Sequence, residues 1–231
     1  ISIAEETDFI VPLGLWVLEQ ACRKAYAWSE VFGRNSAPSI SINLSPRPFA
    51  QADLVEKVLG ILIETRVNPR QIKLEITESG TIGDPERAVQ VAIALKALGV
   101  ELSIDDFGTG YSSLSYLHRL PIDVLKIDRS FVSGMHRRSE EFTIVRSMID
   151  LGHNLGLEVV AEGVEHADDL QLLRRLGCDL AQGYHLSRPL PLDQLLAWLD
   201  RYGAATPTAG TTAPAAVDAG PPPGLLHVIP G

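Results

Sequence analysis

Apolar and polar residues alternate along several short stretches of the chain, with the period of two that is typical of β-strands. In the first stretch, Ile40, Ile42 and Leu44 share one face and Ser41 and Asn43 share the other. The same division recurs in later stretches, which predicts strands with one apolar face and one polar face. The predicted strands are 39–45, 71–77, 102–106, 124–131, 158–164 and 180–186.

Apolar residues at helical spacing fill the intervals between these strands. Asp84 precedes Pro85, a capping side chain before a residue whose φ is already helical, and this pair predicts a helix start. Strand and helix therefore alternate, which predicts an α/β fold with a largely parallel sheet. The predicted helices are 8–32, 53–66, 85–98, 140–155, 167–176 and 192–202.

Polar residues recur at the carboxyl ends of the predicted strands. Asn43, Glu75 and Asp105 are 32 and 30 residues apart, about the length of one strand–helix unit in an eight-unit barrel. An open sheet would gather such residues at one switch point, whereas here they follow nearly every strand. We therefore predict a TIM-like (β/α)8 barrel whose polar face lines the lumen. The other polar candidates are Asp106, Lys126, Asp128, Glu162 and Gln182.

Two adjacent carboxylates, Asp105 and Asp106, end one apolar strand just before the turn Gly108-Thr109-Gly110. Like charges this close repel, and a shared proton or a divalent cation relieves the repulsion. A solvated turn is the alternative interpretation of the same dipeptide. Carboxylate and amide oxygens favour Mg²⁺ or Mn²⁺, whereas Zn²⁺ prefers the His and Cys that the strand ends lack.

The order and spacing of the motifs resemble the EAL-domain phosphodiesterases, which hydrolyse the bacterial second messenger cyclic di-GMP. The resemblance runs from Ile3 to Trp198. It rests on Ala4-Glu5-Glu6-Thr7, Asn43-Leu44-Ser45, Glu75-Ile76-Thr77-Glu78-Ser79, Asp105-Asp106-Phe107-Gly108-Thr109-Gly110-Tyr111-Ser112-Ser113-Leu114, Leu125-Lys126-Ile127-Asp128, Ala161-Glu162-Gly163-Val164-Glu165 and Gln182-Gly183-Tyr184.

The resemblance implies a role for each matching residue. Asn43, Glu75 and Asp105 would bind a first divalent cation, and Asp105, Asp106 and Glu162 a second. The remaining roles are as follows: Lys126 near the attacking water or the phosphate, Asp128 orienting Lys126, Gln182 placing water or ligand, Glu78 bracing the loop after Asp106, and Glu165 as a loop-bracing carboxylate.

The implied reaction opens cyclic di-GMP to linear 5′-pGpG. Two cations about 3.5–4 Å apart would activate the water and neutralise the leaving oxygen. Ca²⁺ would bind but inhibit, because its coordination is larger and looser. The resemblance also implies a homodimer and, in the parent protein, sensory or cyclase-type domains.

The family's domain opens with a strand bearing Glu-Ala-Leu, whose Glu is a metal ligand, and this sequence starts after it at Ile1. Without that strand, the barrel would have two exposed edges, and one ligand would be missing. We therefore expect residues 1–231 alone to have weak activity or none. The alternative is a degenerate domain that binds cyclic di-GMP without cleavage, as a receptor or regulatory module.

Composition narrows the remaining possibilities. Twenty basic and 29 acidic residues give a net charge of −9, which argues against nucleic-acid binding on a basic surface. No signal peptide and no run of 18 apolar residues is present, so we expect a cytoplasmic segment without membrane contact of its own, either in a cytoplasmic protein or as the cytoplasmic part of a larger membrane-anchored one. The two cysteines, Cys22 and Cys178, lie far apart in the sequence, and we expect both to be buried free thiols rather than a disulfide.

The composition also divides the chain into two parts. Residues 1–202 would form the domain. Residues 203–231 have no Lys or Arg and are rich in Ala, Pro, Thr and Gly, which predicts a disordered tail. Within it, Leu225-Leu226-His227-Val228-Ile229 is either a short docking motif or a chance apolar run.

Overall fold

The computed structural model describes residues 1–34, 37–49, 51–78, 84–110, 114–191, 194–195, 197–198 and 227–229. The chain forms two compact units. The first comprises Ile1–Asp128 and Ser147–Val160, and the second Arg129–Arg146 and Ala161–Gly231. Strands and helices alternate as predicted, which makes this an α/β fold.

The elements follow in this order along the chain. They are α1 (Ser2–Glu6), α2 (Ile10–Phe32), β1 (Ile40–Leu44), α3 (Pro46–Phe49), α4 (Leu54–Thr65), η1 (Pro69–Gln71), β2 (Ile72–Thr77), α5 (Pro85–Ala97), β3 (Glu101–Phe107), α6 (Leu114–Leu117), β4 (Val124–Ile127), α7 (Arg129–Val132), η3 (Met135–Arg137), α8 (Ser139–Asn154), β5 (Glu158–Ala161), α9 (Ala167–Leu176), β6 (Leu180–Gln182) and β7 (His227–Ile229).

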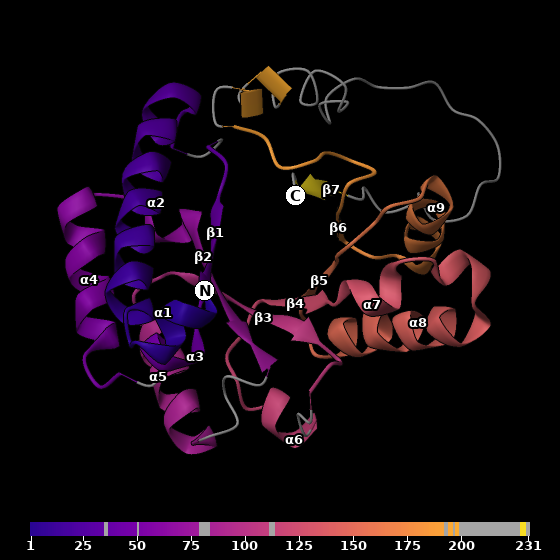
Figure 1. The fold of residues 1–231 in the computed structure, drawn as a ribbon, viewed down its shortest axis with the longest axis horizontal. Helices are drawn as coiled ribbons and strands as arrows, with labels where there is room; N and C mark the ends of the chain where they lie inside the picture. The colour runs from indigo at the N-terminus through magenta and orange to yellow at the C-terminus, as the bar shows by residue number, and fades with distance from the viewer. Residues whose placement is uncertain are drawn as a thin grey trace. The chain divides into compact units, whose positions relative to one another are not determined.

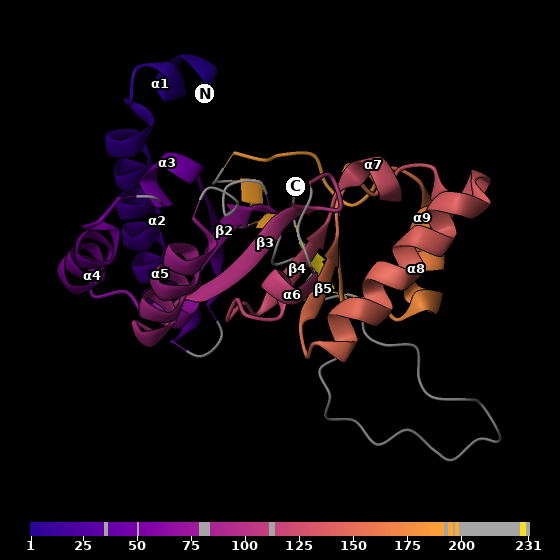
Figure 2. The same cartoon turned by 90° about the horizontal axis from the view of Figure 1, so that it is seen from below.

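The strands of the first unit form a parallel sheet in the order β1-β2-β3-β4-β5. Asn43 on β1 is in register with Glu75 on β2, and Thr77 on β2 is in register with Asp105 on β3. The carboxyl ends of these strands therefore share one edge, where their polar residues gather. Helices α2, α4 and α5 lie side by side next to β1, β2 and β3 (Figures 1 and 2).

The alternation along β2 separates core from lumen as predicted. Ile72, Leu74 and Ile76 are at most 2% exposed and form part of the apolar core. Lys73 and Thr77 are half-buried on the other face, and Glu75 between them is buried at 7% exposure. Burying a carboxylate this deeply is unfavourable unless a cation lies beside it, so we expect a charged site around Glu75 on β2.

Helix starts and ends follow the predicted signals closely. The Asp84 side chain accepts a hydrogen bond from the backbone N–H of Arg87 at 3.1 Å, so the predicted cap of α5 is confirmed. Helix α9 has the predicted bounds and ends at Gly177, whose left-handed φ of +76° closes the last turn. Most of the helix predicted over 192–202 lies outside the described residues.

Several predicted boundaries are wrong. The strands predicted over 124–131, 158–164 and 180–186 end at Ile127, Ala161 and Gln182. The first of these ends early because α7 begins at Arg129. Three residues assigned to a disordered tail, 227–229, instead form β7, which pairs in parallel with β6. Residues 203–226, which make up most of the predicted tail, lie outside the described residues.

A buried carboxylate organises the loop before α8 in the second unit. Asp169, fully buried in the first turn of α9, accepts hydrogen bonds from the backbone N–H of Gly134 at 3.1 Å and of His136 at 2.9 Å. Its Oδ1 also lies 2.7 Å from Nδ1 of His136. Three contacts on one buried carboxylate make Asp169 the anchor between α9 and η3.

Asp169→Asn is expected to lower the free energy of unfolding by about 1–3 kcal/mol, because an amide cannot accept all three hydrogen bonds. Asp168→Asn is the matched control, since Asp168 lies in the same helical turn but is exposed. Urea denaturation of the three proteins measures the difference. Equal decreases in the free energy of unfolding of both variants would show that only the favourable interaction of a negative charge with the helix dipole is lost.

Both cysteines are buried free thiols, as predicted. Burial raises the pKa of Cys22 to about 11 and that of Cys178 to about 12. Neither thiol forms a reactive thiolate near neutral pH, so both act as small core residues. None of the described helices is long and apolar enough to span a membrane.

Candidate metal and phosphodiester site

Lys126 joins two of the predicted metal ligands. Its Nζ donates a hydrogen bond to Oε2 of Glu75 at 2.8 Å and forms an ion pair with Oδ1 of Asp105 at 2.9 Å. The three residues come from adjacent strands β4, β2 and β3 of the first unit, and all are at most 8% exposed. The positive charge of one buried ammonium group thus lies between the negative charges of two buried carboxylates. Water screens the attraction between these charges only weakly, because all three are buried.

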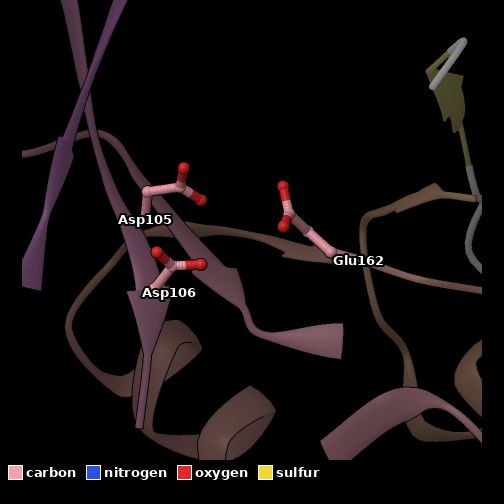
Figure 3. Close-up of side chains that lie close together, drawn as sticks. All are labelled: Asp105, Asp106 and Glu162. Atoms are coloured by element: carbon pink, nitrogen blue, oxygen red, sulfur yellow. The ribbon is translucent and has the colours of Figure 1, made fainter. Parts of the chain in front are cut away.

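A backbone irregularity brings Asp105 and Asp106 to the same place. Consecutive strand residues normally point to opposite faces. Here the β3–β4 register shifts between Ile104 and Phe107, and Asp106 has a left-handed φ of +54°. One carboxylate oxygen of each aspartate consequently lies within 4.8 Å of the other (Figure 3). Bulges commonly redirect a side chain in this way beside functional sites.

Charge and burial at Asp106 raise the pKa of its carboxyl group. Burial is the largest cause, and the negative charges of Asp105 and Asp128 add to it, while Lys126 opposes them. A second cation near these carboxylates would relieve the same repulsion. The buried Oδ1 of Asp105 also has no hydrogen-bond partner among the described residues, although it lies in the ion pair with Lys126. This all-oxygen donor set fits Mg²⁺ or Mn²⁺.

Glu78 anchors the glycine-rich turn that follows the two aspartates. It is 3% exposed, and its Oε2 accepts hydrogen bonds from the backbone N–H of Gly108 at 2.9 Å and of Gly110 at 3.2 Å. A Cβ at Gly110 would lie 2.9 Å from Cδ of Glu78, so a larger residue there would displace the Glu78 carboxylate. These contacts support the predicted bracing role of Glu78. Residues 111–113 of the motif lie outside the described part of the chain.

Gly110→Ala is expected to push the Glu78 carboxylate away from the turn and to break both hydrogen bonds. We expect amide exchange at residues 108–110 to accelerate about tenfold or more, because each backbone hydrogen bond contributes about 1 kcal/mol. Gly60→Ala in α4 is the control, since no atom lies within 4 Å of its added Cβ. Unchanged exchange in Gly110→Ala would refute the bracing role.

Two candidates of the second unit lie on tightly packed backbone. Glu162 directly follows β5 and is labelled in Figure 3; it is half-buried. The next residue, Gly163, has a φ of +68°, and a Cβ there would lie 2.2 Å from Cβ of Arg129. The backbone C=O of Gln182 accepts a hydrogen bond from the N–H of Val164 at 3.0 Å. The segments carrying Glu162 and Gln182 therefore support each other.

The remaining candidates have fewer described contacts. Asn43 is exposed at the end of β1, and Asp128 is half-buried directly after β4. Glu165 is exposed and has no side-chain hydrogen bond or ion pair with the described residues, so its bracing role stays a prediction. His185 is exposed, whereas His136 packs against His166 with ring centroids 5.3 Å apart.

The comparison with protein families is decisive. The family model described as the EAL domain matches residues 1–189. The chain belongs to the EAL-domain family. This membership confirms the resemblance drawn from the strand-end motifs.

Two curated relatives of this EAL domain come from Pseudomonas aeruginosa. The bifunctional diguanylate cyclase/cyclic di-GMP phosphodiesterase MucR is 44% identical over 197 residues, covering 85% of this chain and 28% of its own length. The cyclic di-GMP phosphodiesterase NbdA is 39% identical over 209 residues, covering 90% of this chain and 26% of its own length. The chain therefore spans about a quarter of these relatives.

A solved structure establishes the fold of the EAL domain. The PaMucR phosphodiesterase in complex with c-di-GMP matches with a TM-score of 0.80 at 44% identity, covering 84% of this chain and 78% of that chain. The predicted TIM-like barrel class is thereby confirmed.

Sequence reasoning missed three features of this EAL domain. It placed Lys126 near the attacking water or the phosphate and did not foresee the contacts of Lys126 with Glu75 and Asp105. It did not foresee the left-handed backbone at Asp106. It also did not foresee the contact between His136 and Asp169. The partners in these contacts lie far apart in the sequence, so no local pattern indicates them.

Proposed function

We propose that this EAL domain is a metal-dependent phosphodiesterase that hydrolyses cyclic di-GMP to linear 5′-pGpG. One observation carries the proposal: Glu75, Asp105 and Lys126 form a buried charged group next to Asp106. The proposal is also supported by the 44% identity to MucR, which is named a diguanylate cyclase and cyclic di-GMP phosphodiesterase. The similar solved structure of the PaMucR phosphodiesterase is a complex with c-di-GMP.

The residues that would hold the cations are those with oxygen donors at the strand ends. Asn43, Glu75 and Asp105 would hold one, and Asp105, Asp106 and Glu162 the other. Bound Mg²⁺ or Mn²⁺ would lower the pKa of a water molecule and neutralise charge on the phosphodiester oxygens. Glu162 is included because it directly follows β5 and because the family resemblance implies that it is a ligand.

The other side chains act through position and charge. The Lys126 ammonium, held by Glu75 and Asp105, would stabilise negative charge on a phosphate oxygen or orient the attacking water. Asp128 lies two positions after Lys126, directly after β4, and would orient Lys126. Glu78 would keep the turn after Asp106 in one conformation, and Gln182 would position water or ligand.

The test is turnover of cyclic di-GMP with Mg²⁺, Mn²⁺, Ca²⁺ or EDTA, with the products separated by chromatography. It compares residues 1–231 with a fusion that supplies a Glu-Ala-Leu strand ahead of Ile1. Linear pGpG that requires Mg²⁺ or Mn²⁺, is suppressed by Ca²⁺ and is lost in Glu75→Gln would support the enzyme. Binding without product from both proteins would leave a receptor and refute the hydrolase.

The proposal includes the setting in which the domain acts. We place it in the cytoplasm of a bacterial cell as a homodimer, joined to sensory or cyclase-type domains. Two free buried cysteines support a reducing compartment, and the cyclase named in MucR supports a cyclase-type neighbour. Light scattering across a dilution series tests the dimer; a constant monomer mass would refute it.

A further inference from the structure

Two histidine rings lie against each other in the second unit, outside the candidate phosphodiester site. His136 belongs to η3, and His166 is the residue directly before α9. Their ring centroids are 5.3 Å apart, and the ring planes are inclined at 70°. Imidazole is a common protein ligand of Zn²⁺ and related transition metals. Whether this pair can bind a metal ion depends on where the lone pairs of its ring nitrogens lie.

The hydrogen bonds of His136 determine which of its ring nitrogens carries the proton. The buried Asp169 carboxylate accepts hydrogen bonds from two backbone N–H groups, so its Oδ1, 2.7 Å from Nδ1 of His136, is an acceptor there too and Nδ1 carries hydrogen. Nε of Arg137 donates a hydrogen bond to Nε2 of His136 at 2.9 Å, which requires a lone pair on Nε2. A histidine that donates one N–H to a carboxylate and keeps a lone pair on its other nitrogen has the usual arrangement of a metal ligand.

His166 supplies a second imidazole, and no hydrogen bond fixes its orientation. It is exposed, and its side chain forms no hydrogen bond or ion pair with the described residues. The χ2 torsion of histidine has a broad energy minimum, so this ring can turn in place. Two imidazoles bound to one Zn²⁺ at N–Zn distances of about 2.0–2.1 Å and a tetrahedral angle have ring centroids roughly 5 Å apart. The observed 5.3 Å matches that separation, so a turn of the His166 ring is the main adjustment required.

We propose that His136 and His166 form a Zn²⁺-binding site in which Asp169 is the positioning residue that orients His136. Water molecules would complete the coordination of the ion. The bound Zn²⁺ would join η3 to the start of α9, the two elements that Asp169 already connects. Imidazole nitrogen suits Zn²⁺, whereas carboxylate and amide oxygens suit Mg²⁺ and Mn²⁺, so this site differs in selectivity from the oxygen donors at the strand ends.

Arg137 is the group with which Zn²⁺ must compete. Its Nε occupies the lone pair of Nε2 of His136, and its positive charge disfavours a cation nearby. The side chain is exposed, so its guanidinium can return to water when the ion binds. Arg137→Gln should therefore bind Zn²⁺ severalfold more tightly than the unchanged chain. Unchanged or weaker binding in Arg137→Gln would contradict coordination through Nε2 of His136.

Calorimetric titration with Zn²⁺ tests the site in residues 1–231, with excess Mg²⁺ present to occupy the oxygen ligands of the strand ends. His166→Asn removes the second imidazole and leaves asparagine, a favourable residue at a helix start. We expect this variant to bind Zn²⁺ about tenfold or more weakly, since losing a ligand costs no less than losing a residue that orients one. His185→Asn, at another exposed histidine of the second unit, is the matched control and should bind as the unchanged chain does.

The ¹⁵N NMR resonances of the imidazoles report the ligand atom and the tautomer directly. We expect Zn²⁺ to shift the Nε2 resonance of His136 while Nδ1 stays protonated. In Asp169→Asn, the side-chain amide can donate to Nδ1, so the proton should move to Nε2 and Zn²⁺ affinity should fall about 10- to 100-fold. An unchanged tautomer and affinity in Asp169→Asn would refute its orienting role.

Equal Zn²⁺ affinity in His166→Asn, His185→Asn and the unchanged chain would overturn the proposed site. A resonance of Nε2 of His136 that does not respond to Zn²⁺ would overturn it as well. Neither measurement involves cyclic di-GMP, so the site and the proposed phosphodiesterase activity stand or fall independently.

Discussion

Glu75→Gln, introduced in the fusion that supplies a Glu-Ala-Leu strand ahead of Ile1, is expected to lower hydrolysis of cyclic di-GMP at least about 100-fold, because losing a ligand should cost no less than losing a residue that only supports a metal site, which costs roughly 10- to 100-fold. The substitution keeps size and shape but removes the charge that Lys126 neutralises. Lys126 retains its ion pair with Asp105, so the fold should persist. A large loss of activity with little loss of stability is therefore the expected combination.

Steady-state kinetics and thermal denaturation measure these two effects separately. Glu64→Gln is the matched control, because Glu64 is exposed on α4 and has no side-chain partner among the described residues. Binding of Mn²⁺, followed by calorimetry, should weaken in Glu75→Gln and not in Glu64→Gln. If Glu75→Gln hydrolysed cyclic di-GMP as fast as the control, the assignment of Glu75 as a ligand would be wrong.

The strand ends could be predicted because their signal is local. A period of two separates Glu75 from Leu74 and Ile76 within β2, and parallel strands bring Asn43 and Glu75 to the same level. Each step needs only neighbouring residues and the rule that parallel strands end at one edge. The list of candidate site residues follows from this pattern and from the family resemblance.

The geometry at β3 could not be predicted in the same way. Simple alternation places Asp105 and Asp106 on opposite faces, and only the register shift and the left-handed φ of Asp106 bring both carboxylates together. Pairing of β3 with β4 decides that shift, and β4 is distant in sequence. The same holds for β7, since composition describes residues 203–231 but not the edge against which three of them pair.

Two neighbouring acidic residues show the limit of local reasoning about buried charge. Asp168 and Asp169 both lie in the first turn of α9, where acidic side chains favour the helix dipole. One is exposed, and the other is fully buried with three hydrogen-bonding contacts to η3 and its cap. Their difference arises from the tertiary contact, which the sequence of α9 does not contain.

Lys126→Met is expected to lower the free energy of unfolding by about 3–5 kcal/mol in EDTA, because it removes the cation from two buried carboxylates. Glu75 and Asp105 are 7% and 8% exposed, so water cannot replace the lost charge effectively. Lys57→Met is the control, since Lys57 forms an exposed ion pair with Asp53 one helical turn away, and water screens such a pair so strongly that losing it changes stability little.

Mg²⁺ or Mn²⁺ should restore much of the stability that Lys126→Met loses. A cation at 100 times its dissociation constant stabilises a folded protein by about 2.7 kcal/mol, and two uncompensated carboxylates should bind it more tightly than the same pair held by Lys126. Thermal denaturation across a titration of each cation measures this shift. Equal shifts in Lys126→Met and Lys57→Met would mean that Lys126 and the cation do not share carboxylates. Hydrolysis should stay low in Lys126→Met even when the fold is restored, because the cation replaces the charge of the ammonium but not its hydrogen bonds to phosphate or water.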